Sequence, residues 1–542
     1  MTTTMAWDYL IVTASNDAQG TAYEQQLAHR QQLGLLPQFR NFMVVTDLEG
    51  KRIGSGGSTV LCIMRVLDRE IEGRQGPLTG PADIEQILRR LRIMIIHAGG
   101  DSRRLPAYGP CGKIFIPVPG KLTSQLAPTL FDRLLPSFLA LPAPQADAGQ
   151  MLVLSGDALL LFNPRSVRMD LPGITALACY DTPEHSSKHG VFVPDGMSVK
   201  AYLQKPSPET QRALGAINAS GQTALDVGIM SFDAAAILLL LKAFDVTQSS
   251  DGKFDWAPDS RRRILARSLD LYREICCALG TEATREHYVR SARDSGSTWD
   301  DDALAHIYEI LHSMPFHLQV VPSCQFMHFG TTKQLITSGL ELLTHDLGQA
   351  PARTTLSLNT KLTDQAEITG TNSWVEGCTL TAPLRLTGQN VIVGADITTP
   401  LSLPEKVCLD IVPGYDRQGT SVHFVRCYGI ADTFKDSLEK GGTLCGLPLL
   451  IWLEAAGLPP EAVWASGVPL AYRSLWDARV FPAVKRHAEF MQWLWLFDIK
   501  HATPQQKLAY QQSDRYSAAE VAIMTNQDAF YARRKLNLDE PN

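Results

Sequence analysis

Continuous apolar runs alternate with amphipathic stretches through the first part of the chain. Residues 93–97, 151–155 and 176–180 are strongly apolar, and each is followed closely by glycine or aspartate. Residues 84–91 place apolar side chains at the i, i+3, i+4 and i+7 spacing of an amphipathic helix. Buried strands between helices are typical of a largely parallel sheet that is covered on both faces. The pattern therefore predicts an α/β domain over residues 1–345.

The pattern changes after about residue 350. Over residues 356–412 the helical period disappears, and apolar side chains recur every five to seven positions between Gly, Asn, Thr and Ser. Short strands at near-hexapeptide spacing predict a β-solenoid over residues 346–435, with a small β-sandwich as the alternative. Residues 436–542 predict a helical tail that carries five of the nine tryptophans, which we expect to be packing residues.

Composition and charge exclude several classes of protein. The 542 residues are 45% apolar and 20% charged, as in ordinary globular proteins, and the net charge of −6 gives no general attraction for nucleic acid. No run approaches the ~20 apolar residues that span a bilayer, and residues 1–8 lack the basic segment of a secretory signal. The ten cysteines form no C-x-x-C pair. We therefore expect a cytoplasmic protein with reduced thiols, no zinc site and no nucleic-acid or membrane partner.

The clearest chemical signal directly follows a predicted strand. Ligands bind at the carboxyl ends of such strands, and Gly99 and Gly100 have no Cβ, so backbone N–H groups can approach phosphate oxygens. Arg103, Arg104 and Lys113 then concentrate positive charge, which an anion between them would relieve. A triphosphate is the natural candidate, and a solvated basic loop beside a tight turn is the alternative.

A second glycine-rich segment covers residues 54–59, which follow a predicted strand and open a predicted helix. Thr59 occupies the third-glycine place of G-x-G-x-x-G, so the dinucleotide signal is weak. Gly56 and Gly57 remain candidates for contacting phosphate or base at a helix N-terminus. Lys113 is followed by isoleucine rather than serine or threonine, which excludes a Walker A loop.

Further candidates lie at the ends of later predicted strands. Asp157 follows a buried strand, where a carboxylate can hold Mg²⁺ against phosphates, and Asp226 is the candidate second carboxylate. Lys205 is placed to meet a second phosphate, and His189 and His328 are candidates for lining a pocket. The alternatives are a turn role for the aspartate, a surface role for the lysine and structural roles for the histidines.

These motifs, in this order, resemble the fucose-1-phosphate guanylyltransferase (GDP-L-fucose pyrophosphorylase) family, as in the N-terminal half of bifunctional fucokinase/GDP-fucose pyrophosphorylases. The resemblance covers roughly residues 40–435, and its most specific segment is His-Ala-Gly-Gly-Asp-Ser-Arg-Arg-Leu-Pro-Ala-Tyr-Gly-Pro at 97–110. Shorter matching segments occur at residues 52–59, 112–115, 155–157, 189–193, 203–207, 226–229, 328–331, 409–413 and 428–429.

The resemblance implies a Rossmann-like nucleotidyltransferase core with a GT-A-like mixed sheet, followed by a left-handed β-helix-like domain. The general signature of the superfamily is G-G-x-G-T-R-L, in which Ser102 here replaces the third glycine and Arg103 the threonine. The resemblance implies these roles: catalytic cations Arg104, Lys113 and Arg103; nucleotide-binding residues Gly56, Gly57, Gly99, Gly100, Asp101 and Ser102; sugar-phosphate and substrate contacts Lys205, His189 and His328; magnesium ligands Asp157 and Asp226.

The implied reaction is one in-line displacement, in which L-fucose 1-phosphate attacks the α-phosphorus of GTP and pyrophosphate leaves. Three alternatives stay open: another sugar-1-phosphate nucleotidyltransferase, a non-catalytic sugar-nucleotide-binding regulatory protein, and a GHMP-type sugar kinase that uses residues 54–59. About 110 residues follow residue 435 without a Gly/Ser-rich kinase loop, so no fucokinase activity is expected. Solenoid edges often self-associate, which makes a homo-oligomer a candidate assembly. The chain can be a complete enzyme or a piece of a longer one.

Overall fold

The computed structural model describes residues 7–72, 78, 80–120 and 126–534, and the chain divides into two compact units. The expectation that the N-terminus carries no secretory signal concerned residues 1–8. Residues 1–6 lie outside the described residues. The predicted segments 1–345, 346–435 and 436–542 have other boundaries than these units and stay a prediction. Unit 1 comprises Met1–Gly99, Leu134–Gly156 and Leu160–Phe326, and unit 2 comprises Gly100–Arg133, Asp157–Leu159 and Met327–Asn542.

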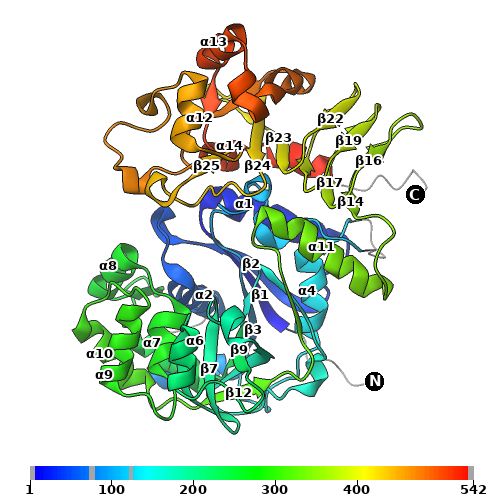
Figure 1. Ribbon diagram of the computed structural model, residues 1–542. Coiled ribbons are helices and arrows are strands. Elements are labelled where there is room, and N and C mark those ends of the chain that lie inside the picture. The colour runs from blue at the N-terminus through cyan, green and yellow to red at the C-terminus, as the bar shows by residue number, and fades with distance from the viewer. Residues whose placement is uncertain (1–6, 73–77, 79, 121–125, 535–542) are drawn as a thin grey trace. The chain divides into compact units, whose positions relative to one another are not determined.

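Unit 1 is built around a nine-stranded mixed sheet (Figure 1). Its strands, in spatial order, are β2 (Phe39–Thr46), β1 (Trp7–Ala14), β3 (Arg92–His97), β4 (Gln150–Ser155), β9 (Thr223–Phe232), β6 (Ile174–Asp181), β12 (Phe316–Val320), β8 (Ser198–Gln204) and β7 (Gly190–Asp195). The first four run parallel, whereas β9 is antiparallel to both β4 and β6. The α/β prediction is confirmed, with a mixed sheet.

Helices cover this sheet because its central strands are apolar on both faces. The apolar residues of β3 and β4 are buried and share one core with the apolar face of α2 (Gly54–Ile71). Each fully buried aliphatic side chain of this kind contributes about 1.5–3 kcal/mol. The helix predicted at residues 84–91 is α3 (Pro81–Leu88), which ends earlier because the chain must extend into β3.

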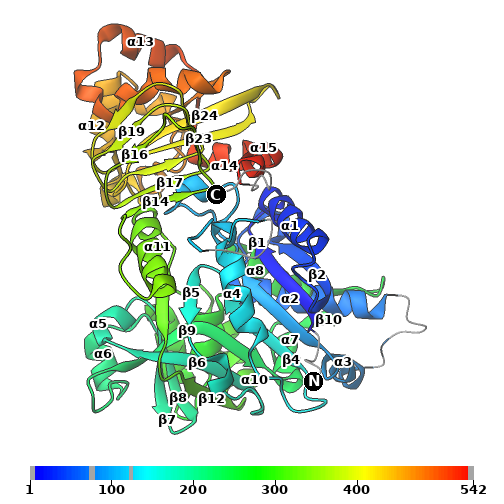
Figure 2. The same ribbon diagram turned by 90° about the vertical axis from the view of Figure 1, so that its right-hand side faces the viewer.

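The other helices and strands of this part of the chain are shorter or lie nearer the surface. Figure 2 shows α1 beside β1 and β2. The bounds are α1 (Asp17–Gln32), α4 (Leu130–Leu139), β5 (Ala158–Leu161), α5 (Pro183–Ser186), α6 (Pro208–Ala213), α7 (Ala234–Ala243), β10 (Val246–Gln248), β11 (Phe254–Trp256), α8 (Pro258–Arg267), α9 (Arg285–Asp294), α10 (Asp301–Leu311) and β13 (Gln325–His328).

Unit 2 contains three stacks of short parallel strands that follow α11 (Thr332–Leu347) (Figure 2). Paired residues lie 16 to 18 positions apart, as in Ile368 with Leu384, Trp374 with Val391 and Leu362 with Leu380, so each turn of chain adds one strand to every stack. This parallel pairing agrees with the predicted repeat and not with a β-sandwich. The stacks are β14 (Thr355–Leu358), β17 (Ser373–Glu376), β20 (Val391–Val393) and β23 (Val407–Tyr415); β15 (Lys361–Leu362), β18 (Thr379–Leu380) and β21 (Asp396–Ile397); β16 (Ile368–Thr369), β19 (Leu384–Leu386) and β22 (Leu401–Leu403).

The C-terminal part of the chain adds helices and antiparallel strands to the first of these stacks. Trp452, Trp464, Trp476 and Trp493 are buried, which confirms their predicted packing role. Among the described residues, no helix combines the length and the apolar character needed to cross a bilayer. The bounds are β24 (Ser421–Gly429), β25 (Thr443–Leu444), β26 (Leu447–Pro448), α12 (Leu449–Ala456), β27 (Phe481–Val484), α13 (Pro504–Gln512), β28 (Arg515–Tyr516), α14 (Ala518–Met524) and α15 (Gln527–Ala532).

Candidate active site

The glycine- and arginine-rich loop begins at the carboxyl end of β3, where α/β sheets bind their ligands. Gly100 has φ +114°, a conformation that L side chains rarely adopt, so this position requires glycine. Gly99 has ordinary φ and ordinary contacts around its Cβ position. Ser102 has φ 54°, and its buried hydroxyl oxygen has no hydrogen-bond partner in the structure. An unpaired buried hydroxyl is unfavourable by about 1–3 kcal/mol. A ligand that forms a hydrogen bond with Ser102 would remove this cost.

The two arginines of the loop differ in their surroundings. The Nε atom of Arg103 lies 3.0 Å from a carboxylate oxygen of Asp101, and its guanidinium lies 6.0 Å from the ring centre of Trp476. Arg104 has an exposed side chain, while its carbonyl oxygen accepts a hydrogen bond of 3.0 Å from the amide of Thr332. The loop therefore fixes the backbone of Arg104 and directs its side chain toward solvent.

A cation, a carboxylate and an imidazole meet within unit 2. The Nζ atom of Lys113 lies 3.1 Å from Oδ2 of Asp157, and Nε2 of His328 lies 3.3 Å from the same oxygen. The other ring nitrogen of His328 lies 3.2 Å from Oε1 of Gln334. Although burial opposes it, hydrogen bonds and charge from His328 and Lys113 hold the pKa of Asp157 well below its usual range. Asp157 is therefore ionised at neutral pH.

Sequence analysis missed the residues that anchor this loop from the stacked strands of unit 2. The hydroxyl of Tyr108 donates to Oε2 of Glu376 over 3.2 Å and accepts a hydrogen bond of 2.8 Å from the indole of Trp374. Arg534 donates to the same carboxylate oxygen over 2.6 Å, and Asn359 donates to the other over 2.9 Å. Glu376 lies on β17, and Arg534 follows α15, 158 positions further along the chain, so this buried ion pair leaves no local pattern that predicts it.

Replacing Glu376 with glutamine is expected to lower the free energy of unfolding by about 3–5 kcal/mol, because the buried Arg534 guanidinium then lacks its counter-charge. The Glu376 side chain is fully buried and that of Arg534 is only 8% exposed. Urea unfolding followed by tryptophan fluorescence measures the change. The matched control is Glu439→Gln at an exposed glutamate of the same unit, which should leave stability unchanged. Equal stability of both variants would contradict the anchoring role.

Within unit 1, the glycines at the start of α2 have a packing role. The amides of Gly56 and Gly57 donate to the carbonyl oxygen of Leu269 over 2.9 and 3.1 Å. A Cβ on Gly54 would lie 2.3 Å from the same oxygen. These contacts explain why the positions are occupied by glycine. The same amides are the ones that a helix N-terminus would otherwise donate to a phosphate. Nucleotide contact by Gly56 and Gly57 stays a prediction.

A partly buried histidine, His97, joins this helix to the strand that leads into the loop. Nε2 of His97 lies 2.9 Å from the hydroxyl of Thr59, which itself donates to the carbonyl of Ser55. Nδ1 of His97 lies 3.4 Å from the hydroxyl of Thr13, which also accepts from the amide of Ala98. Burial lowers the pKa of His97 to about 4, so the ring is neutral at physiological pH. His97 therefore holds α2, β1 and β3 in register.

The structure brings His189 and Lys205 together. The amide of Lys205 donates to the carbonyl of His189 over 3.0 Å, where the β7–β8 hairpin opens, and the lysine side chain is exposed. The ring of His189 lies 5.4 Å from that of His185 and 5.5 Å from that of Phe326. The ring of His185 in turn contacts the carboxylate of Asp181 at 2.6 Å. These residues form a histidine cluster at the carboxyl end of β6.

Asp226 is a buried carboxylate on β9. Its oxygens accept hydrogen bonds of 2.8 Å from the hydroxyl of Tyr202 and 2.7 Å from the amide of Gly228. Burial raises the pKa of Asp226 to about 6, although both hydrogen bonds favour the ionised form. Gly228 has φ +72°, and a Cβ there would lie 2.9 Å from that of Ser155 at the end of β4.

The raised pKa of Asp226 predicts a pH-dependent stability. A carboxyl group with a folded-state pKa of about 6 and an ordinary value of 3.8 stabilises the fold fully below pH 3.8 and loses that contribution as the pH rises through 6. Asp226→Asn removes the titration. The free energy of unfolding of the variant, relative to the parent, should therefore rise by about 2–3 kcal/mol between pH 4 and pH 7. Denaturant unfolding across this range measures it, and a difference independent of pH would contradict the raised pKa.

The described residues fit a magnesium ion only in part. Among them, no group of three or more His, Cys, Asp or Glu side chains could hold a metal ion. Asp157 fits, because it is ionised and its side chain is 34% exposed. Asp226 fits less well, because it is buried and its oxygens already accept hydrogen bonds. Mg²⁺ usually keeps several waters and phosphate oxygens, so one or two carboxylates are enough to recruit it with a nucleotide.

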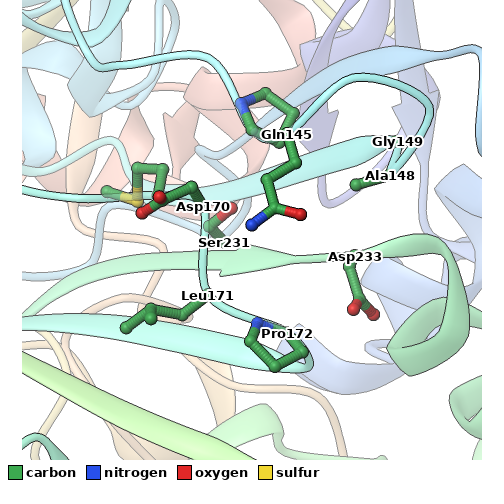
Figure 3. Close-up of a pocket in the computed structure, with 10 residues that line it drawn as sticks. Gln145, Ala148, Gly149, Asp170, Leu171, Pro172, Ser231 and Asp233 are labelled. Atoms are coloured by element: carbon green, nitrogen blue, oxygen red, sulfur yellow. The ribbon is translucent and has the colours of Figure 1, made fainter.

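A cavity of about 300 Å³ lies in unit 1, and none of the site residues predicted from the sequence lines it (Figure 3). Gln145 and Gly149 precede β4, and Asp170 precedes β6, so the cavity lies at the amino ends of these parallel strands. Its charged lining residues are Asp170 and Asp233. Acidic lining at the end of the sheet opposite the usual ligand edge does not favour a phosphate site.

Comparison with known proteins agrees with the resemblance carried by these motifs. The model of the fucose pyrophosphorylase domain matches residues 85–486. This match spans the loop after β3, the Lys113, Asp157 and His328 group, and the stacked strands of unit 2. The chain therefore belongs to the fucose pyrophosphorylase family.

Three curated relatives are similar to most of this chain. The bifunctional fucokinase/GDP-fucose pyrophosphorylase of Arabidopsis thaliana is 26% identical over 95% of this chain and 50% of its own length. The L-fucokinase/L-fucose-1-P guanylyltransferase of Bacteroides fragilis is 25% identical over 91% of this chain and 48% of its own length. The fucose-1-phosphate guanylyltransferase of Homo sapiens is 26% identical over 88% of this chain and 81% of its own length. The chain thus spans about half the length of the first two relatives.

A solved structure described as mannose-1-phosphate geranyltransferase from Thermus thermophilus aligns with 78% of this chain and 95% of its own. The TM-score is 0.29 and the sequence identity 9%. A likeness of this size supports no conclusion about fold or function.

Proposed function

We propose that this chain is a nucleotidyltransferase that forms GDP-L-fucose and pyrophosphate from GTP and L-fucose 1-phosphate. The observation that carries the proposal is the contact of Lys113 and His328 with an ionised Asp157, in the unit that also holds the Arg103–Arg104 loop. Membership of the fucose pyrophosphorylase family and the names of the relatives supply the substrates.

In this reaction the protein contributes positioning and charge neutralisation rather than covalent chemistry. We assign Arg104 and Lys113, supported by Arg103, to the phosphates of the nucleotide. Lys113 would exchange its contact with Asp157 for a phosphate oxygen. Asp157 would hold magnesium, which when bound stabilises negative charge on phosphate oxygens. The role of Asp226 as a magnesium ligand stays a prediction. Loss of one such electrostatic contact typically raises the barrier by about 3 kcal/mol.

The remaining residues are proposed to bind the substrates. Gly99, Gly100, Asp101 and Ser102 would follow the nucleotide phosphates, because Gly100 has φ +114° and no side chain to keep a ligand away, and the Ser102 hydroxyl has no hydrogen-bond partner among the described residues. Gly56 and Gly57 stay predicted nucleotide-binding residues at the start of α2. Lys205 and His189, whose backbones are joined by a hydrogen bond, would bind the sugar phosphate. His328 is proposed as a separate substrate contact.

The architecture proposed for this function has a GT-A-like, Rossmann-like core followed by a left-handed β-helix-like domain. The strand order of the nine-stranded sheet and the 16- to 18-residue repeat of unit 2 support it. A cytoplasmic location, assembly into a homo-oligomer and the three-segment division of the chain belong to the same proposal.

The direct test is product formation. Purified protein is incubated with GTP, Mg²⁺ and L-fucose 1-phosphate, and GDP-L-fucose is sought by mass spectrometry while pyrophosphate release is followed. Parallel reactions with ATP, CTP and UTP, and with other sugar 1-phosphates, separate this function from that of another sugar-1-phosphate nucleotidyltransferase. Binding of GDP-L-fucose without turnover would instead indicate a regulatory protein.

A further inference from the structure

Two cysteines far apart in sequence have adjacent thiols in unit 1. We propose that Cys324 and Cys179 form a redox-active dithiol, which a peroxide converts into an intramolecular disulfide. The inference is independent of the proposed function.

The sheet topology brings the two cysteines together. Strands β6 and β12 pair in parallel, with Val320 opposite Ala178, and the amide of Val321 donates to the carbonyl of Ala178 over 2.8 Å. Cys179 is the next residue along β6. After Val321 the chain bends and returns, so the thiol of Cys324 makes a hydrogen bond with that of Cys179. Both cysteines are free thiols in this structure.

Cys324 is one of the two cysteines with a partly exposed side chain. Cys324 and Cys445 are partly exposed, whereas the other cysteines are buried. Cys179 is only 5% exposed, so an oxidant in solution reaches Cys324 first. Cys324 is thus the accessible thiol with a second thiol in contact, which is the arrangement of an attacking and a resolving cysteine.

The contact between the two thiols also changes their pKa values. A hydrogen bond from the Cys179 thiol lowers the pKa of Cys324, although burial opposes it, and that contact raises the pKa of Cys179. Burial raises the pKa of the other eight cysteine thiols, Cys62, Cys111, Cys276, Cys277, Cys378, Cys408, Cys427 and Cys445. Because the thiolate is the nucleophile and Cys324 is the more accessible of the two sulfurs, we assign the first attack to Cys324.

The chemistry needs one equivalent of peroxide. The Cys324 thiolate attacks one peroxide oxygen, the O–O bond breaks, and a sulfenic acid forms as hydroxide leaves and takes a proton to become water. The Cys179 sulfur then attacks the sulfenic sulfur, the S–O bond breaks, and the thiol proton leaves with the hydroxyl as a second water. Two thiols are oxidised by two electrons, and the peroxide is reduced to two waters.

The disulfide would connect the two segments that hold the histidine cluster. Asp181, which contacts His185, lies two residues after Cys179, and Phe326, which contacts His189, lies two residues after Cys324. A bond between the cysteines restrains both segments at once. The reduced form leaves them joined only by noncovalent contacts.

Oxidation of the full chain with one equivalent of hydrogen peroxide tests the proposal. After alkylation of the remaining thiols, eight of the ten cysteines should carry the label, and peptide mapping should find one Cys179–Cys324 disulfide with a mass loss of about 2 Da. A reductant should restore all ten thiols. Disulfides elsewhere, or ten labelled cysteines after peroxide treatment, would overturn the proposal.

Three variants assign the roles. Cys179→Ser should leave a sulfenic acid on Cys324 that dimedone traps, and Cys324→Ser should give neither disulfide nor dimedone adduct. The matched control is Cys445→Ser, at the other partly exposed cysteine, which should still form the Cys179–Cys324 disulfide. Dimedone labelling of Cys179 instead of Cys324 would contradict the assigned order of attack.

Discussion

Replacing Asp157 with asparagine is expected to lower kcat for GDP-L-fucose formation about 100- to 1,000-fold. The carboxylate accepts contacts from both Lys113 and His328 and stays ionised. Asparagine has nearly the same shape but no charge. It therefore removes the proposed metal ligand and the counter-charge that positions Lys113, and it adds no steric change.

The loss must be separated from unfolding. The contacts of Asp157 with Lys113 and His328 also stabilise the fold, so thermal unfolding of the variant is measured first and activity is compared at a temperature at which both proteins are folded. The matched control is Asp364→Asn, at an exposed aspartate of the same unit, which should retain full activity. Steady-state rates at saturating GTP and L-fucose 1-phosphate measure the effect, and parental turnover in Asp157→Asn would refute the assignment.

Replacing Arg104 with alanine is expected to lower kcat/KM for GTP by a similar factor, about 100- to 1,000-fold. The side chain is exposed while its backbone is fixed by Thr332, so the guanidinium is available to a ligand and contributes little to the fold. Arg103 is paired with Asp101, so Arg103→Ala should have the smaller effect. Arg104→Ala should therefore lower kcat/KM more than Arg103→Ala, because the Arg104 side chain is exposed and that of Arg103 is paired with Asp101.

Arg353→Ala, at an exposed arginine of unit 2, is the matched control and should behave as the parent. Pyrophosphate release at varied GTP concentration gives kcat/KM for each variant. An equal or larger loss in Arg103→Ala than in Arg104→Ala would contradict the assigned roles. Thermal unfolding of all variants should coincide within error.

Local patterns predicted the elements but not their assembly. Apolar periodicity identified β3, β4 and β6 as buried strands, and the five- to seven-residue spacing identified the repeat of unit 2, because strand burial leaves a direct trace in sequence. The mixed direction of the sheet did not follow from that pattern. The antiparallel strand β9 is as apolar as its parallel neighbours, so hydrophobicity alone does not reveal its direction.

The candidate site shows the same limit. The motifs located Lys113, Asp157 and His328 separately, and only the fold brings their side chains into contact. The glycines at 56 and 57 are explained by packing against Leu269, which lies more than 200 positions away and has no signature of its own. From the sequence alone, the anchoring Glu376 cannot be distinguished from other polar residues of the β-repeat, because its partners Tyr108 and Arg534 come from distant segments.

The most direct test of the account is a crystal structure of the protein soaked with GTP and Mg²⁺. The account predicts that the triphosphate lies along residues 100–104, that Lys113 has moved from Asp157 to a phosphate oxygen, and that Asp157 contacts the metal. A triphosphate bound elsewhere, with Lys113 still paired to Asp157 and the Ser102 hydroxyl still without a partner, would contradict it.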